Sequence, residues 1–116
     1  MEITITTDTN PETWGTYVTD ETAEKAADEL ARRLEVFARR EWPGTEVTAT
    51  SRAYPCGVGG GGDVNVYVNG RYYDPNQVRD WQALNAQEEE VATAIHAEWE
   101  RIWVDVLAEL ATDDDI

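Results

Sequence analysis

Residues 63–73 have the sequence DVNVYVNGRYY, which is the pattern of a β-hairpin. Valines occupy every second position of its first half and alternate with polar residues and a tyrosine, as expected of a strand with one buried face. Asn69-Gly70 favours a two-residue turn, because both residues tolerate a positive φ. Residues 71–73 then form the returning strand, so the middle of the chain predicts antiparallel β-structure.

Before this hairpin, the sequence predicts further strands and one long helix. Residues 2–7 alternate isoleucine with threonine, which is typical of a half-buried strand, and residues 14–18 can form a return strand. The helix expected over residues 20–42 has capping residues before it, an apolar face at helical spacing, and Pro43-Gly44 after it. Residues 45–54 follow as another strand.

After the hairpin, the sequence predicts two helices. Asp74-Pro75-Asn76-Gln77 combines a cap, a proline at the first helical position and a capping-box glutamine, which predicts a short helix over residues 75–84. The capping-box pattern recurs at 85–88, and a helix with an apolar stripe is expected over residues 86–111. The expected order is β(β)α-βββ-αα. This grouping predicts an α+β fold in which helices cover one face of a mostly antiparallel sheet.

The composition is that of a globular domain. The chain has 116 residues, of which 41% are hydrophobic, and five Trp and five Tyr can fill a core. We expect a single α+β domain over residues 1–116, ending in a short acidic tail at 112–116. No apolar run reaches the roughly 20 residues that span a bilayer, and the N-terminus lacks a signal-peptide pattern, so a cytoplasmic location is expected. The single cysteine, Cys56, excludes an internal disulfide and fits a reducing compartment.

The charge of the chain is strongly lopsided. It has 24 Asp and Glu against 9 Lys and Arg, a formal net charge of -15, and residues 86–116 hold ten acids and one base, Arg101. Such a field repels nucleic acid and anionic membranes and attracts basic protein surfaces. The alternative is that acidity is a proteome-wide trait of a salt-adapted or high-GC organism, which the presence of a single lysine, Lys25, also fits.

No combination of residues specifies a reaction. The glycine-rich run 57–62 lacks the Lys-Ser or Lys-Thr pair and the following helix of a phosphate-binding loop. Cys56 and His96 are each the only residue of their kind, which is too few for a zinc site and a weak basis for nucleophilic catalysis. We therefore expect no catalytic residues, no metal and no cofactor. An unrecognised carboxylate-based enzyme is a third hypothesis, because acids are abundant.

The primary candidates for binding a basic partner are acids on the last helix. Helical spacing places them on the two flanks of its apolar stripe. They are Glu98, Asp105 and Glu109 on one flank, and Glu89 and Glu100 on the other. We expect Arg101 to be the only base available to neutralise them, which leaves their field free to act on a partner.

Two weaker candidates lie elsewhere. The first helix carries a line of acids, but pairing of Asp28 with Arg32 and of Glu35 with Arg39 is expected to neutralise part of it. The hairpin turn is surrounded by Tyr and Arg, residue types that are common at protein interfaces. The members of this second candidate patch are Tyr67, Arg71, Tyr72 and Tyr73.

A small, one-domain, strongly acidic chain with no catalytic set resembles the counter-defence proteins of phages, such as anti-CRISPR proteins and DNA mimics. The resemblance rests on size, on the clusters Glu88-Glu89-Glu90 and Asp113-Asp114-Asp115, and on the acidic flanks of the last helix. It is a resemblance of composition over the whole chain, not of a motif. It implies a non-enzymatic inhibitor or binding protein whose partner holds nucleic acid through Arg and Lys. The alternative is a small accessory α+β protein whose acidity has no role in recognition.

Overall fold

The computed structural model describes residues 1–9, 19–53, 63–73 and 85–110. The predicted return strand at 14–18, the short helix at 75–84 and the acidic tail at 112–116 lie outside these residues. The described elements confirm the α+β class and follow one another in the order β1 (Glu2–Thr9), α1 (Asp20–Glu41), β2 (Glu46–Ala53), β3 (Asp63–Val68), β4 (Arg71–Tyr73) and α2 (Ala86–Leu110).

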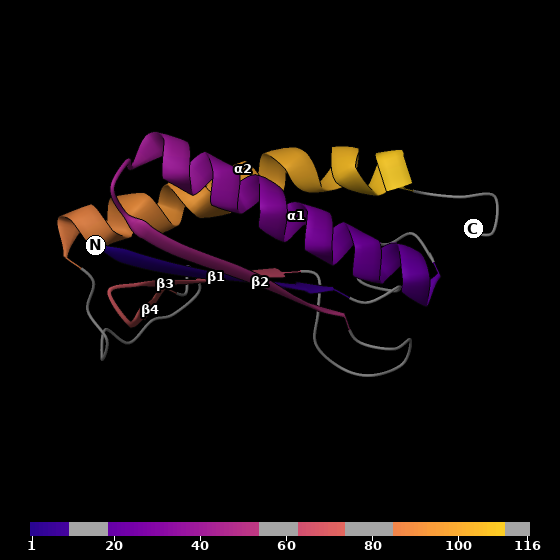
Figure 1. The fold of residues 1–116 in the computed structure, drawn as a ribbon, viewed down its shortest axis with the longest axis horizontal. Coiled ribbons are helices and arrows are strands. Elements are labelled where there is room, and N and C mark those ends of the chain that lie inside the picture. Colours follow the sequence, from indigo (N-terminus) through magenta and orange to yellow (C-terminus); the bar gives the residue numbers. More distant parts are fainter. Residues whose placement is uncertain (10–18, 54–62, 74–84, 111–116) are drawn as a thin grey trace.

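The strands form a four-stranded mixed sheet in the order β2-β1-β3-β4. The central strand β1 pairs parallel with β2 and antiparallel with β3, and β3 pairs antiparallel with β4. The mostly antiparallel sheet is therefore confirmed. The parallel pairing was not predicted, and it arises because α1 carries the chain from the end of β1 back to the start of β2, next to it (Figure 1).

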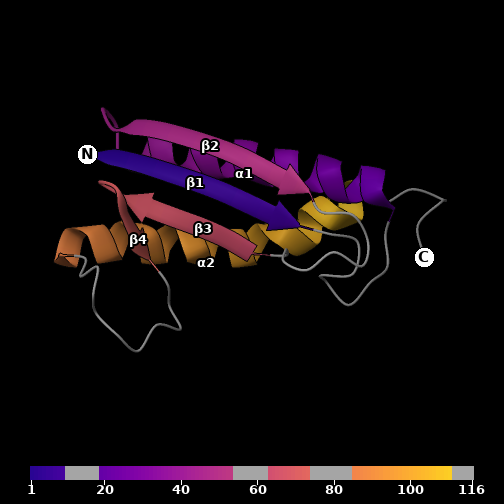
Figure 2. The same cartoon turned by 90° about the horizontal axis from the view of Figure 1, so that it is seen from below.

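Both helices lie on one face of the sheet, as predicted, and Figure 2 shows the opposite face turned toward the viewer with the helices behind it. α1 packs on β1 and β2, whereas α2 packs on β3 and on α1. No helix among the described residues is long and apolar enough to cross a membrane. The layer between helices and sheet is the core of the molecule.

The core is formed by the alternating residues of the strands and the apolar stripes of the helices. Its largest fully buried apolar side chains are Ile3, Ile5, Leu30, Leu34, Val64, Val66, Val68, Val91, Ile95 and Val106. The Thr7 hydroxyl is also buried, and it donates a hydrogen bond of 2.8 Å to the carbonyl oxygen of Ala27 in α1. Burying this polar group is tolerable because it has a partner.

The ends of the elements follow local chemistry. Thr19 caps α1 by accepting a hydrogen bond of 3.1 Å from the backbone N–H of Thr22. In the hairpin turn, Asn69 and Gly70 have φ values of 52° and 79°, as predicted for a turn that needs positive φ at both positions. Asn69 also fixes the start of β1, because its side-chain oxygen accepts a hydrogen bond of 2.9 Å from the N–H of Glu2.

Candidate functional site

The acids predicted on one flank of α2 line a groove between α1 and α2. The groove has a volume of about 240 Å³ and is lined by three acids, three arginines and three apolar residues. Its lining residues are Arg33, Val36, Phe37, Arg40, Glu98, Arg101, Ile102, Asp105 and Glu109. The formal charges of this set cancel, although Asp105 is exposed and forms no ion pair with any residue that the structure describes.

Two of these acids are held in ion pairs. Arg101 donates to Glu98 at 2.5 Å, and Arg33 of α1 donates to Glu109 at 2.5 Å. The hydrogen bond to Glu98, together with the charges of Glu98 and Asp105, raises the pKa of Arg101 above its ordinary value. The prediction that Arg101 is the only base available to the acids of this helix is therefore wrong, because Arg33 reaches them from α1.

Arg33 also belongs to a network within α1. Arg32 and Arg33 both donate to Glu29, with Nε–oxygen distances of 3.0 and 2.9 Å. The hydrogen bond from Arg32, and next that from Arg33, lowers the pKa of Glu29 to about 2 against the opposing effect of its partial burial. The predicted pairing of Arg32 with Asp28 is wrong, because Arg32 forms its ion pair with Glu29, three residues before it in α1.

The other predicted pair of α1 is confirmed. Arg39 lies 3.7 Å from Glu35. Asp28 instead accepts a hydrogen bond from the hydroxyl of Ser51 in β2. Of the two predicted ion pairs on α1, only that of Glu35 with Arg39 forms. Asp28 is bound instead by Ser51, which is distant in sequence.

The outward side of α2 carries three acids that lie outside this groove. Glu89, Glu90 and Glu100 are exposed and form no ion pair with any residue that the structure describes. Glu89 and Glu100 belong to the predicted candidate set, whereas Glu90 was named only as part of an acidic cluster. We call Glu89, Glu90 and Glu100 the outer acids of α2.

Glu88, next to the outer acids, is buried and has a structural role. Its side chain is 3% exposed and accepts hydrogen bonds from Asn69 Nδ2 at 3.0 Å, Arg71 Nη1 at 2.9 Å and the N–H of Asn85 at 3.0 Å. The bond from Asn85 is the largest cause of a lowered Glu88 pKa, followed by that from Asn69. The Asn85 side chain in turn accepts from the N–H of Glu88, which confirms the predicted capping box.

The predicted patch around the hairpin turn is split by the sheet. Tyr67 and Tyr72 lie opposite each other on the face away from the helices, with ring centroids 5.2 Å apart. Arg71 lies on the other side, bound to buried Glu88. The side chain of Tyr73 is outside the described part of the molecule. Arg71 therefore lies on the other face of the sheet from Tyr67 and Tyr72, because alternate residues of a strand point to opposite faces.

A polar chain crosses the uncovered face of the sheet. The Tyr72 hydroxyl donates to Asn65 Oδ1 at 3.1 Å, Asn65 Nδ2 donates to Asp8 Oδ2 at 2.6 Å, and Arg52 Nε donates to Asp8 Oδ1 at 3.1 Å. These four residues come from β4, β3, β1 and β2 in turn. The alternation of residues 64–69 predicted that Asn65 points away from the valines, but only the strand order places it beside Asp8 and Tyr72.

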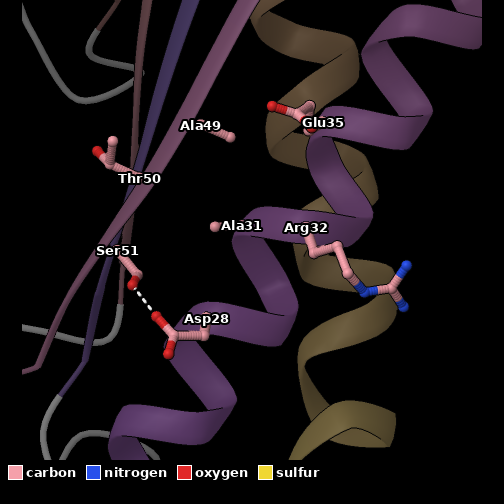
Figure 3. Close-up of a pocket in the computed structure, with 7 residues that line it drawn as sticks. All are labelled: Asp28, Ala31, Arg32, Glu35, Ala49, Thr50 and Ser51. Carbon is pink, nitrogen blue, oxygen red and sulfur yellow. Dashed lines mark hydrogen bonds between the residues drawn. The ribbon is translucent and has the colours of Figure 1, made fainter.

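A second pocket lies between α1 and the edge strand β2. It has a volume of about 270 Å³ and is lined by Asp28, Ala31, Arg32, Glu35, Ala49, Thr50 and Ser51. Figure 3 shows the methyl groups of Ala31 and Ala49 between helix and strand, with the Asp28–Ser51 hydrogen bond at one end. Thr50 points away from α1, toward the uncovered face. The pocket contains no set of groups that resembles a catalytic centre.

The described residues contain no group of three or more His, Cys, Asp and Glu side chains that could hold a metal ion. His96 is half-buried in the middle of α2, and Cys56 lies outside the described residues. Comparison with protein families, curated proteins and solved structures gave no match. The function must therefore be argued from the surfaces of this chain alone.

Proposed function

We propose that this chain is a non-enzymatic acidic binding protein that occupies a basic, nucleic-acid-binding surface of a partner protein. The observation that carries the proposal is the state of the outer acids of α2. They are exposed, they stand on one long helix, and they pair with no described base. The chain as a whole adds a formal charge of -15, which steers basic surfaces toward it over a range set by ionic strength.

The distinction between paired and unpaired acids matters for binding. Glu98 and Glu109 already accept hydrogen bonds from Arg101 and Arg33, so a new cation gains less free energy at these acids than at an acid without a partner. The outer acids form no ion pair with a described residue, so binding a partner's Arg or Lys displaces water from them and breaks no described ion pair. Glu89 and Glu100 are eleven residues apart, which is about 16 Å along the helix axis. This length suits contact with several cations of one basic groove.

The test uses two triple variants of equal charge. The first is Glu89→Gln, Glu90→Gln and Glu100→Gln, which removes the outer acids. The matched control is Glu2→Gln, Glu24→Gln and Glu41→Gln, which makes the same charge change at exposed positions on β1 and α1. Both sets keep the side-chain length, and circular dichroism establishes that both variants fold.

Partners are captured from nuclease-treated lysate of the source organism with the wild-type protein. The Kd of each captured nucleic-acid-binding protein is then measured with the wild type and both variants, together with displacement of a labelled DNA duplex. We expect the α2 variant to bind at least tenfold more weakly, or ~1.4 kcal/mol, and the control to stay close to the wild type. Equal Kd values for the wild type and the α2 variant, or capture without displacement of nucleic acid, would reject the proposal.

The alternative of an accessory protein whose acidity is a proteome-wide trait has one observation in its favour. Most basic side chains of the described residues form ion pairs on the protein's own surface, among them Lys25 with Glu21 at 2.9 Å and Arg52 with Asp8 at 3.1 Å. Acids spread in this way over several elements are what general acidity produces. Stability at low salt separates the two explanations.

A further inference from the structure

The strand β2 forms one edge of the described sheet and pairs only with β1. The N–H of Glu46 donates to the carbonyl of Met1 at 3.2 Å, so Glu46 and every second residue after it point their backbone groups toward β1. The backbone groups of Val47, Ala49 and Ser51 therefore point outward. Arg39 donates to the carbonyl of Val47 at 3.1 Å, and the structure gives the outward groups of Ala49 and Ser51 no partner among the described residues.

The sequence of β2, EVTATSRA, does little to prevent pairing with another strand. Between Glu46 and Arg52 it has only uncharged small or β-branched residues, with no Pro, Gly or Lys. Its register with β1 runs without interruption from Glu46 to Ala53, so it contains no bulge. Edge strands that avoid association usually carry a Pro, a bulge or charges along the edge, whereas β2 has charges only near its two ends, at Glu46 and Arg52.

We propose that this edge binds a second copy of the chain, with the two β2 strands antiparallel about a two-fold axis at Ala49. In this register Ala49 lies opposite Ala49 of the second copy, and Val47 lies opposite its Ser51. Residues with outward backbone groups thus meet one another, and every outward N–H and C=O of the three residues gains a partner. The carbonyl of Val47 has two lone pairs, so it can keep Arg39 while it accepts from the second copy.

The same register is self-complementary in charge. It places Glu46 opposite Arg52 of the second copy and Arg52 opposite its Glu46. These residues lie on the uncovered face and form a non-hydrogen-bonded pair, the kind in which side chains approach most closely. If the two-fold axis passes through Thr48 or Thr50 in place of Ala49, the residue opposite Glu46 in the second copy is uncharged. Of the two-fold registers of this strand, the one centred on Ala49 alone pairs the two charges.

A second charge pair follows on the helix side. Asp28 bonds Ser51, and Arg39 bonds the carbonyl of Val47, so these two α1 side chains mark the two ends of the edge. Since Ser51 lies opposite Val47 of the second copy, Asp28 comes close to Arg39 of that copy, and the reverse holds by symmetry. The pocket in Figure 3 lies between α1 and this edge strand, with the Asp28–Ser51 hydrogen bond at one end.

The net charge of -15 on each chain opposes this association at long range. The charge pairs act over a few ångströms and are less sensitive to salt. We therefore expect the dimer to become tighter as ionic strength rises from about 20 mM to about 300 mM, because the shorter Debye length screens the repulsion between the two net charges. A dimer held by attraction between unlike surfaces has the opposite dependence.

The test is sedimentation equilibrium of the full chain between about 1 μM and about 1 mM, which covers moderate to weak Kd values. Glu46→Arg and Arg52→Glu each place like charges opposite one another, and each should weaken self-association at least tenfold. In a 1:1 mixture of the two variants both charge pairs are opposite again, so the mixture should dimerise like the wild type. Glu2→Arg makes the same charge change one strand away and is the matched control.

Ala49→Pro gives a second, independent arm. It removes an N–H that points away from β1, which an edge strand tolerates, and should abolish the dimer while leaving the circular dichroism spectrum unchanged. A wild-type chain that stays monomeric over the whole concentration range would overturn the proposal. So would a dimer that neither Ala49→Pro nor the charge variants weaken, or a mixture that fails to restore association. This inference does not depend on the proposed function.

Discussion

Arg33 of α1 and Glu109 of α2 form an ion pair across the groove between the two helices, with Nη2 and Oε2 2.5 Å apart. Arg33 also donates to Glu29 on its own helix, at 2.9 Å. Both hydrogen bonds raise the pKa of its guanidinium, that to Glu29 first. One arginine thus connects acids of two helices. Because Arg33 pairs with Glu109, the acids of α2 differ from one another in how far their charge is neutralised.

The pKa of Glu29 predicts a stability loss in acid. Its folded-state pKa of about 2 lies below its ordinary value of 4.5. The folded state therefore binds this proton less readily, so the stabilisation is complete above about pH 5 and is lost as the pH falls toward 2. We expect Glu29→Gln to lower stability at pH 7 and to flatten the dependence of the urea midpoint on pH. Equal pH dependence in variant and wild type would contradict this assignment.

Leu34 and Ile102 test the core between helices and sheet. Leu34 is fully buried, and Ile102 is 6% exposed. Either residue changed to Ala should lower the free energy of unfolding by about 2–5 kcal/mol, because the lost methyl groups leave a cavity. Urea denaturation followed by circular dichroism measures the change. Val36→Ala, at a position that is 51% exposed on the same helix as Leu34, is the control and should change little.

Glu88 should be far more sensitive than its neighbour Glu89. Glu88→Gln weakens the bonds from Asn69, Arg71 and Asn85 that join the start of α2 to the hairpin, whereas Glu89→Gln alters an exposed side chain. We expect the first change to lower Tm clearly and the second to leave it near the wild type. Combining Glu88→Gln with Arg71→Met should cost less than the sum of the single changes, because both remove the same contact. Additive effects would show that the two residues act separately.

Low salt separates functional acidity from salt adaptation. A chain adapted to high salt, with unscreened self-repulsion, should lose stability sharply below about 0.1 M salt, where the Debye length exceeds ~10 Å. A binding protein of an ordinary cytoplasm should stay folded there. We expect the circular dichroism signal at 222 nm, a helix signal, to persist at about 10 mM salt. Unfolding under these conditions would remove the main support for a partner-directed role of the outer acids.

Local patterns in the sequence predicted most elements of the fold. Alternating valines and Asn69-Gly70 predicted the β3–β4 hairpin, and the apolar face before Pro43-Gly44 predicted α1 to within one residue of its end. The capping box at Asn85 predicted where α2 begins. These features depend on neighbouring residues only, since turn dihedrals, caps and hydrophobic period are properties of short segments. They were enough to predict the α+β class.

Strand order and charge pairing were decided by the tertiary structure. Nothing local places β1 between β2 and β3, or makes its pairing with β2 parallel, because a strand's period does not identify its neighbours. The same limit applies to Arg33 with Glu109, Arg71 with Glu88 and Asp28 with Ser51, whose partners lie 17 to 76 positions apart. The composition of residues 86–110 sets how many acids α2 carries. The packing of α1 and of the hairpin against α2 places Arg33 beside Glu109 and Arg71 beside Glu88. Which acids of α2 are paired therefore depends on the bases that the fold brings within a few ångströms.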